Sequence, residues 1–220
     1  MHNAQALQIM VTGNGVAPAT TGEILADIQA EAVLATQVID RHRTMLRSRQ
    51  LQKKPIDVHS VIDECLALVA HDMRARQIEA TLDLSSTPCV IDGDQVLLEQ
   101  VLVNLVRNAM DALTETPPAR RRITIRCAVR AADVEVSVCD TGPGLPAEVM
   151  ATLFTPFVTT KTNGLGVGLT IARTIVEAHG GTISARENLD GGATFTVTLR
   201  RNATPARPYP SPPNAIPSEL

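Results

Sequence analysis

The strongest constraint on this chain is a strand-forming stretch that carries a carboxylate on its apolar face. Residues 134–140 read VEVSVCD, and this alternation places three valines on the same side as Asp140. An unpaired charge on that side would cost several kcal/mol, so Asp140 needs a hydrogen-bond donor. Gly142 and Gly144 follow directly, and a turn without Cβ atoms lets another molecule approach the backbone.

A second glycine-rich stretch precedes a predicted helix further along the chain, with Gly164, Gly166 and Gly168 at alternate positions. The N-terminus of a helix offers backbone N–H groups and the positive end of the helix dipole to an anion. A carboxylate acceptor combined with such a phosphate cradle indicates a nucleotide-binding pocket.

The composition excludes several classes of protein. Apolar residues make up 44% of the 220-residue chain but aromatic residues only 2%, so the core must be aliphatic. A net charge of −3 gives no reason to expect nucleic acid. No stretch approaches the roughly 20 apolar residues that cross a membrane, and no signal peptide is present. We therefore expect a soluble, cytoplasmic chain without a membrane segment. Its four cysteines lack CxxC spacing and are expected to be reduced thiols, mostly in the core: Cys65, Cys89, Cys127 and Cys139.

Three regions follow from the residue pattern. Residues 1–52 predict part of a helical hairpin, because apolar residues recur at three- and four-residue steps between positions 21 and 51. A stripe this wide needs a bundle, so we expect a homodimer through the hairpin; the alternative is packing on the chain's own C-terminal domain. Residues 53–202 are predicted to form one domain, and the proline-rich residues 203–220 to be disordered.

The domain at 53–202 predicts an α+β fold. Helices are expected at 58–70, 94–113 and 167–179, and strands at 78–84, 89–91, 123–129, 134–139, 182–186 and 193–200. The strands at 123–129 and 134–139 favour an antiparallel pair. This order describes a two-layer α/β sandwich, in which helices cover one face of a mixed sheet, and not alternating βαβ winding.

The predicted helix at 94–113 carries a polar stripe opposite its apolar face. The stripe consists of Gln100, Asn104, Arg107, Asn108 and Asp111. Two asparagines one turn apart can offer carbonyl oxygens to a hard cation and amides to phosphate oxygens. This arrangement suits Mg²⁺ bound mainly by nucleotide phosphates; the alternative is the solvated face of an amphipathic helix.

Four segments together carry a family resemblance. NLVRNAMDA (104–112), DTGPGL (140–145), FTPF (154–157) and GLGVGL (164–169) resemble, in order, the N, G1, F and G2 boxes of the histidine-kinase-type ATPases. That superfamily also contains the chaperone Hsp90, the type II topoisomerases and the mismatch-repair protein MutL. In the Hsp90 and topoisomerase branches, a glutamate that activates water stands four residues before the second asparagine. Here that position is Asn104, as in sensor histidine kinases.

The resemblance implies a role for each segment. Asp140 would accept from the adenine amino group, Asn108 would hold Mg²⁺, and Asn104 would support it. The glycines of GLGVGL would bend a lid over the phosphates. The implied catalytic residues are Asn104, Asn108 and Lys161. The implied ATP-binding residues are Asn104, Asn108, Asp111, Asp140, Gly142, Gly144, Leu145, Phe157, Thr160, Lys161, Gly164, Leu165, Gly166, Val167, Gly168, Leu169 and Thr194.

Some of these residues also have simpler interpretations. Lys161 could be a solvent-exposed loop residue instead of a phosphate contact. Thr194 shares the parity of the two threonines that follow it in the strand and could lie on an exposed face instead of seating the adenine. Phe154 and Phe157 would anchor the lid base, and in so aromatic-poor a chain both are expected in the core. His179, at a predicted helix end, is expected to complement the helix dipole.

As a whole, the resemblance implies ATP- and Mg²⁺-dependent phosphorylation of a histidine, with relay to the aspartate of a response regulator. His2 lacks the acidic neighbour and the proline of such an acceptor, and His42 occupies a seam position of the predicted hairpin. We therefore assign no phosphoacceptor within the chain, expect the acceptor upstream of Met1, and expect little autophosphorylation. Two alternatives stay open: a serine kinase of the anti-sigma-factor type, and a non-catalytic, nucleotide-binding dimeric adaptor.

Overall fold

The structure is a computed structural model that describes residues 51–158 and 166–202. The predicted helical hairpin, part of the predicted lid and the proline-rich tail lie outside the described residues, so these three remain predictions. Within the described ranges, no helix has both the length and the hydropathy that crossing a bilayer requires.

The described elements follow one another in the order expected for the domain. They are β1 (Lys54–Asp57), α3 (Val58–Ala75), β2 (Glu79–Leu84), β3 (Val90–Gly93), α4 (Gln95–Ala112), the 3₁₀ turn η1 (Pro118–Arg120), β4 (Arg122–Arg130), β5 (Asp133–Asp140), α5 (Ala147–Thr152), α6 (Gly168–Ala178), β6 (Thr182–Glu187) and β7 (Ala193–Arg200).

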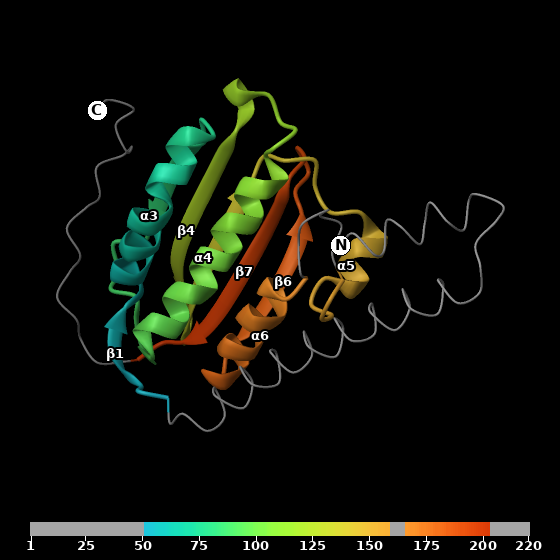
Figure 1. Cartoon of the computed structure of the whole chain (residues 1–220). Helices are drawn as coiled ribbons and strands as arrows, with labels where there is room; N and C mark the ends of the chain where they lie inside the picture. The colour runs from blue at the N-terminus through green and yellow to red at the C-terminus, as the bar shows by residue number, and fades with distance from the viewer. Residues whose placement is uncertain (1–50, 159–165, 203–220) are drawn as a thin grey trace, which may run out of the picture. The chain divides into compact units, whose positions relative to one another are not determined.

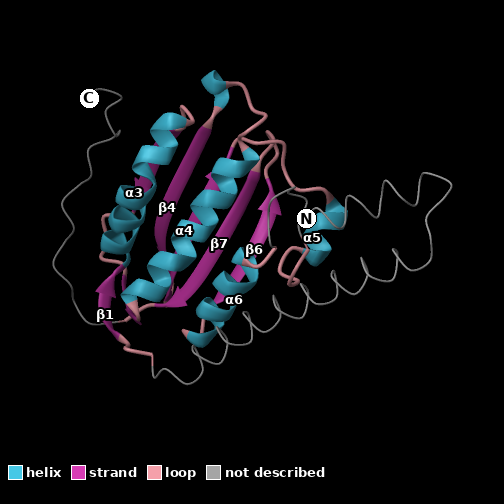
Figure 2. Ribbon diagram, viewed as in Figure 1, coloured by secondary structure: helices cyan, strands magenta, loops and turns pink. Residues whose placement is uncertain are grey.

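Five strands form the main sheet in the order β2–β4–β5–β7–β6. Strand β2 runs parallel to β4, whereas the other neighbours are antiparallel, so the sheet is mixed as predicted. Strands β1 and β3 form a separate antiparallel pair. Helices α3, α4 and α6 lie over one face of the main sheet (Figures 1 and 2). The predicted α+β architecture is therefore confirmed.

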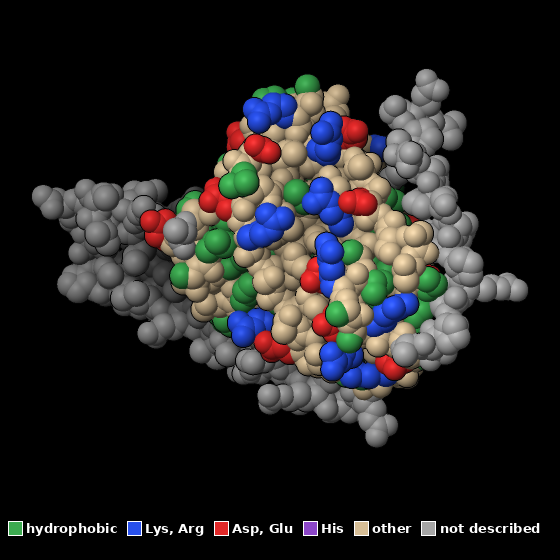
Figure 3. All heavy atoms as spheres, turned by 180° about the vertical axis from the view of Figure 1, so that it is seen from behind, with side chains coloured by type: hydrophobic (Ala, Val, Ile, Leu, Met, Phe, Trp, Pro, Cys, Tyr) green, Lys and Arg blue, Asp and Glu red, His purple; other side chains and the backbone are tan. Residues whose placement is uncertain are grey.

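The other face of the sheet is polar. In β4, Ile123 and Ile125 are buried beneath the helices, whereas Arg122 and Arg126 project from the opposite side. Arg122 lies 3.1 Å from Glu79 of the neighbouring strand. Figure 3 shows basic and acidic side chains interspersed over this open face. Exposed ion pairs of this kind contribute at most about 1 kcal/mol each, so the sheet is stabilised mainly through its buried face.

Both long helices begin at an aspartate cap. Asp57 accepts a hydrogen bond from the His59 N–H at 3.1 Å, and Asp94 accepts one from the Leu97 N–H at 3.4 Å. Helix α3 continues past the predicted end at residue 70, because Met73 adds one more buried position to its apolar face. The short helix α5 was not predicted, since six residues are too few to show a helical period.

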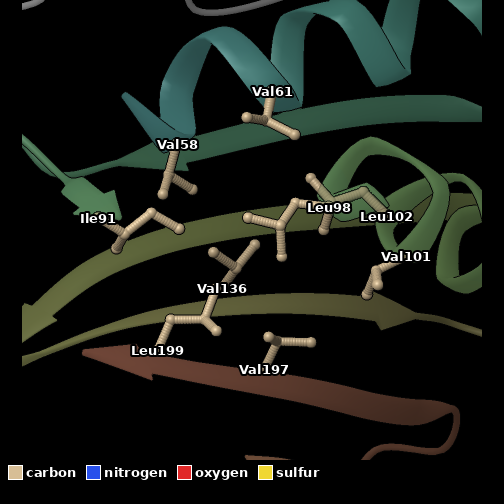
Figure 4. Close-up of a pocket in the computed structure, with 9 residues that line it drawn as sticks. All are labelled: Val58, Val61, Ile91, Leu98, Val101, Leu102, Val136, Val197 and Leu199. Carbon is tan, nitrogen blue, oxygen red and sulfur yellow. The ribbon is translucent and has the colours of Figure 1, made fainter. Parts of the chain in front are cut away.

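The core between the two layers is aliphatic, as the composition predicted, and it retains one small cavity of about 20 Å³ (Figure 4). The side chains around it are Val58, Val61, Ile91, Leu98, Val101, Leu102, Val136, Val197 and Leu199. Its lining is entirely apolar and offers a water molecule no hydrogen-bond partner, so we treat the space as a dry packing defect and not as a ligand site. The four cysteines are free as predicted, three of them buried and Cys139 half-buried.

His179 joins α6 to the start of α4. Its Nδ1 lies 2.8 Å from the Ile175 carbonyl oxygen, and its Nε2 accepts a hydrogen bond from the Asp94 N–H at 2.9 Å. Because a backbone N–H can only donate, Nε2 must be unprotonated and the ring neutral. Burial lowers the pKa of His179, which agrees with this state. The residue therefore lies at the helix end as predicted, but the expected charge interaction with the dipole is wrong.

Candidate functional site

Asp140 lies at the end of β5 with its side chain on the buried face. It is 2% exposed, and the three valines on the same face are buried as predicted. Its Oδ1 accepts hydrogen bonds from the N–H of Gly142 at 2.9 Å and of Ala193 at 3.3 Å. Burial raises the pKa of Asp140, and these two hydrogen bonds partly offset that rise. Within the described residues both donors reach Oδ1, which leaves Oδ2 for a donor from a ligand.

The turn between β6 and β7 fixes the backbone behind Asp140. Gly191 and Gly192 adopt φ angles of 86° and 84°. A Cβ at Gly192 would lie 2.0 Å from the carbonyl oxygen of Asp140, so a larger residue cannot fit without moving the strand end. The Asn188 side chain donates to the same carbonyl at 3.3 Å. The sequence analysis missed Asn188, whose only signal was its position just before the glycine turn.

Thr194 lies on the opposite face of the sheet from Asp140. It pairs with Cys139, and residues paired across strands point to the same side. Its hydroxyl donates to Asn188 Oδ1 at 2.6 Å, and the residue is only 3% exposed. The interpretation of Thr194 as an exposed strand residue is therefore wrong. Its adenine contact stays a prediction, and this orientation does not favour a direct one.

Helix α4 presents Asn104 and Asn108 on one side, and both are half-buried. The Asn104 amide nitrogen donates to the Gly168 carbonyl at 3.2 Å and so ties α4 to the first turn of α6. Asparagine carbonyl oxygens are suitable ligands for Mg²⁺. Asp111, one turn further along, pairs with Arg76 of α3 at 2.9 Å. Its carboxylate already serves this helix contact, and its role toward ATP stays a prediction.

The segment before α6 is closed by a hydrogen bond from the Phe157 N–H to the Gly166 carbonyl at 3.2 Å. A Cβ on Gly166 would lie 2.8 Å from backbone atoms of Phe157 and Val158, so this approach requires glycine. Phe157 has a φ of 65° and is 40% exposed. The prediction of a core position is therefore wrong for Phe157, because the chain turns back at this residue. Phe154 is half-buried, with the Arg173 guanidinium 5.9 Å from its ring centroid.

The structure joins the four motif segments into one region. Asn104 contacts Gly168, and the backbone at Gly142 passes close to the Ala112 carbonyl at the end of α4. Gly144 has a φ of 92° and lies beside Glu187. Three further predicted residues are half-buried. Leu145 lies in the turn after β5, and Val167 and Leu169 lie at the start of α6. Thr160, Lys161, Gly164 and Leu165 lie outside the described residues.

Comparison with known proteins gives a consistent result. Residues 93–203 match the family described as histidine kinase-, DNA gyrase B- and HSP90-like ATPases. The chain is 38% identical over 170 residues to the C4-dicarboxylate transport sensor protein DctS of Rhodobacter capsulatus. The aligned region covers 77% of this chain and 26% of DctS. It is also 38% identical over 170 residues to the sensor protein FixL of Bradyrhizobium diazoefficiens, covering 77% of this chain and 33% of FixL.

Among solved structures, the catalytic domain of histidine kinase ThkA aligns with a TM-score of 0.62 and 30% identity, over 68% of this chain and 96% of that one. The chain thus spans about a quarter to a third of the length of these two curated relatives and nearly all of that catalytic domain. The match covers the segments that build the site around Asp140. On these grounds the chain belongs to the histidine kinase-, DNA gyrase B- and HSP90-like ATPase family, on its sensor histidine kinase branch.

Proposed function

We propose that this chain is the ATP-binding catalytic portion of a cytoplasmic two-component sensor histidine kinase. The parent reaction transfers the γ-phosphoryl group of ATP to a histidine, for relay to the receiver aspartate of a response regulator. The chain would work as a homodimer through residues 1–52. The protein's part in such a transfer is positioning and electrostatic stabilisation, because the phosphoryl group itself needs little covalent assistance.

The observation that carries the proposal is the arrangement of hydrogen bonds at Asp140. Two backbone N–H groups orient the carboxylate through Oδ1, and neither of these hydrogen bonds uses Oδ2. A buried acceptor held in this way is suited to an exocyclic amino group such as that of adenine. Only the ionised carboxylate accepts at both oxygens. Because burial raises the pKa of Asp140, nucleotide affinity should be lost earlier on acidification than with an ordinary carboxylate.

The phosphate end of the site is supported by α4 and α6. The first turn of α6 starts at Gly168 and has no side-chain cap in the described residues, which suits anionic oxygens. Asn108, with Asn104 behind it, offers the oxygen ligand that Mg²⁺ needs when phosphates supply the others. Lys161 and the remaining lid residues would approach the terminal phosphates. Mg²⁺ would supply charge neutralisation at the transferring group.

Two histidines of the domain are too deeply buried to accept a phosphoryl group. His59 is 0% exposed and His179 is 7% exposed, so neither can reach a γ-phosphate in the folded protein. His71 is exposed on α3, within the ATP-binding domain itself, and His2 and His42 have a poor sequence context. These observations support an acceptor histidine outside this chain. We therefore expect little or no autophosphorylation of the chain alone.

Calorimetry with Mg-ATP and with Mg-ADP tests the pocket. In Asp140→Asn the amide oxygen would take the two backbone donors, which places the NH₂ group where the ligand donor should bind. We expect affinity to fall by about 1.5–3 kcal/mol, roughly 10- to 150-fold in Kd. The matched control is Asp133→Asn at the other end of β5, where the carboxylate pairs with Arg200 at the surface. Unchanged affinity in Asp140→Asn would remove the basis for the pocket.

Incubation with γ-labelled ATP tests the reaction class. With a separate helical hairpin that carries a histidine followed by an acidic residue, the proposal expects acid-labile label on the hairpin and none on this chain. Acid-labile label on the chain alone would show that it contains an acceptor. Acid-stable label on a partner protein would favour the serine kinase, and saturable binding without transfer to any acceptor would favour the adaptor.

A further inference from the structure

A cluster of one histidine and two cysteines lies in the core, on elements that the nucleotide site does not use. His59 is in the first turn of α3, Cys89 directly precedes β3, and Cys127 lies in β4. Their exposed fractions are 0%, 0% and 2%. One ligand atom of each residue, the imidazole nitrogen or the Sγ, lies within 4.8 Å of the other two. Three donors typical of thiophilic metals thus converge from separate segments.

The cluster is distinct from the nucleotide site. In β4 it is Ile123 that pairs with Asp140, whereas Cys127 pairs with Val136. Cys127 is therefore four positions along the strand, about 13 Å at the usual rise per residue. The cluster also lies where the domain begins, since the Val58 N–H donates to the Cys89 carbonyl at 3.0 Å.

The three side chains of the cluster also shift one another's pKa values. Hydrogen bonding from Cys127 lowers the pKa of Cys89 despite its burial, and His59 lowers it further. The pKa of Cys127 is raised by the same hydrogen bond and by burial. Burial alone would lower the pKa of His59, but the hydrogen bond and charge of Cys89 outweigh it and raise that pKa. These opposed shifts agree with the close approach of the three groups.

We propose that His59, Cys89 and Cys127 form a binding site for one divalent thiophilic metal ion, Zn²⁺ being the ion that fits best. Tetrahedral zinc, with bonds of about 2.3 Å to sulfur and 2.0–2.1 Å to nitrogen, separates its ligand atoms by roughly 3.4–3.8 Å. The three atoms therefore need to close by at most about 1.4 Å from their 4.8 Å limit. A water molecule would complete the coordination.

Charge selects Zn²⁺ over a monovalent ion. Two thiolates neutralise a divalent cation, whereas Cu⁺ would leave a net negative charge in a buried site. Binding forms two Zn–S bonds and one Zn–N bond. Every proton that the two thiols and the coordinating imidazole nitrogen carry before binding is released to solvent. No oxidation or reduction takes place.

Asp57 is placed to support the histidine ligand. Its carboxylate lies 3.8 Å from His59 Nδ1, beyond hydrogen-bond distance, and the closing of the ligand atoms around a metal ion would bring the two groups into the contact that orients a metal-bound imidazole. Asp57 also caps α3, and asparagine is an equally good cap. Asp57→Asn should therefore preserve the helix and weaken zinc affinity by roughly 10- to 100-fold, the usual effect of losing such a partner.

The test is metal content of the full chain. Bound metal is first removed with a chelator in the presence of a non-thiol reductant. Zn²⁺ is then added either to the folded protein or during refolding, and after desalting the zinc content is measured by mass spectrometry. We expect about one zinc per chain, because the described residues contain one such cluster. With Co²⁺ as probe, we expect thiolate-to-metal charge-transfer absorption. Affinity for either ion should rise with pH, because protons are displaced.

Variants assign the ligands. Cys89→Ala and Cys127→Ala should lose the bound zinc and the cobalt band, whereas Cys65→Ala, equally buried but outside the cluster, should keep both. His59→Gln serves if a cysteine variant fails to fold. Folded wild type that retains no zinc and gives no cobalt–thiolate band would overturn the proposal without any variant. Equal zinc retention in Cys65→Ala and Cys89→Ala, or a Cys89–Cys127 disulfide in place of metal binding, would also overturn it.

Discussion

Replacement of Gly192 by alanine should damage the nucleotide site, whereas the same replacement at a turn glycine away from the site should not. The position combines a φ of 84° with a Cβ location only 2.0 Å from the carbonyl oxygen of Asp140. Gly180, at the end of α6, provides the matched control. Its φ is 77°, but a Cβ there would meet nothing within 4 Å. The two glycines therefore have similar backbone conformations, and only Gly192 lies so close to another backbone segment that a Cβ would collide with it.

The difference can be estimated. A residue with a Cβ in the left-handed region costs about 1–2 kcal/mol, which is the whole expected effect at Gly180. At Gly192 the strand end must also move to relieve the contact, and overpacking of this kind adds about 1–3 kcal/mol. We therefore expect Gly192→Ala to lower the free energy of unfolding by about 2–5 kcal/mol.

Urea unfolding of both variants gives these free energies, and calorimetry with Mg-ATP gives the functional effect. Movement of Gly192 displaces the Asp140 carbonyl and the adjoining Ala193 N–H, so nucleotide affinity should fall in Gly192→Ala even where the protein is folded. It should be unchanged in Gly180→Ala. Equal losses of unfolding free energy in the two variants would refute the argument that the backbone approach at Gly192 shapes the site.

Three further predictions follow. The pKa of His179 is lower in the folded than in the unfolded protein, so the unfolded chain binds a proton first as the pH falls. The free energy of unfolding should therefore decrease below about pH 6.5. In His179→Gln, urea unfolding should show a smaller decrease of this free energy with falling pH. Val197→Ile should add a methylene to the cavity and stabilise the domain by about 0.5–1 kcal/mol, whereas Val134→Ile, buried away from the cavity, should cost about 1–3 kcal/mol in thermal unfolding. Asn104→Glu should lose the hydrogen bond to the Gly168 carbonyl and place a base beside the proposed phosphate site, so Mg-ATP binding should weaken and ATP hydrolysis should rise; phosphate release no faster than that of the wild type would contradict this.

The parts of the fold that sequence could predict are those with a local signal. The alternation that ends at Asp140 gave both the strand and the buried carboxylate, because side-chain direction in a strand follows parity alone. An aspartate before an apolar period, Asp92 or Asp94, likewise marked the start of α4, and the structure shows Asp94 as the cap. Such features depend on neighbours a few residues away, so one sequence contains enough information for them.

The missed features depend on segments that are distant in the chain. Asn188 reaches the Asp140 carbonyl across 48 positions, and Arg76 reaches Asp111 across 35. The parity of Thr194 was identified correctly, but the burial of that face at its position depends on how the glycine turn folds back. No spacing rule connects His59 with the cysteines, since three elements supply that cluster.

The identity of residue 104 has a structural meaning beyond the absence of a general base. Its side chain donates a hydrogen bond to the Gly168 carbonyl, and a carboxylate at that position cannot donate. The residue therefore stabilises the first turn of α6, where the terminal phosphates are proposed to bind, instead of activating water. In a site that passes the phosphoryl group to another side chain, a water-activating base would divert ATP to hydrolysis. In the proposed function the same side chain would position α6 and leave water without a base, and both effects would favour transfer over hydrolysis.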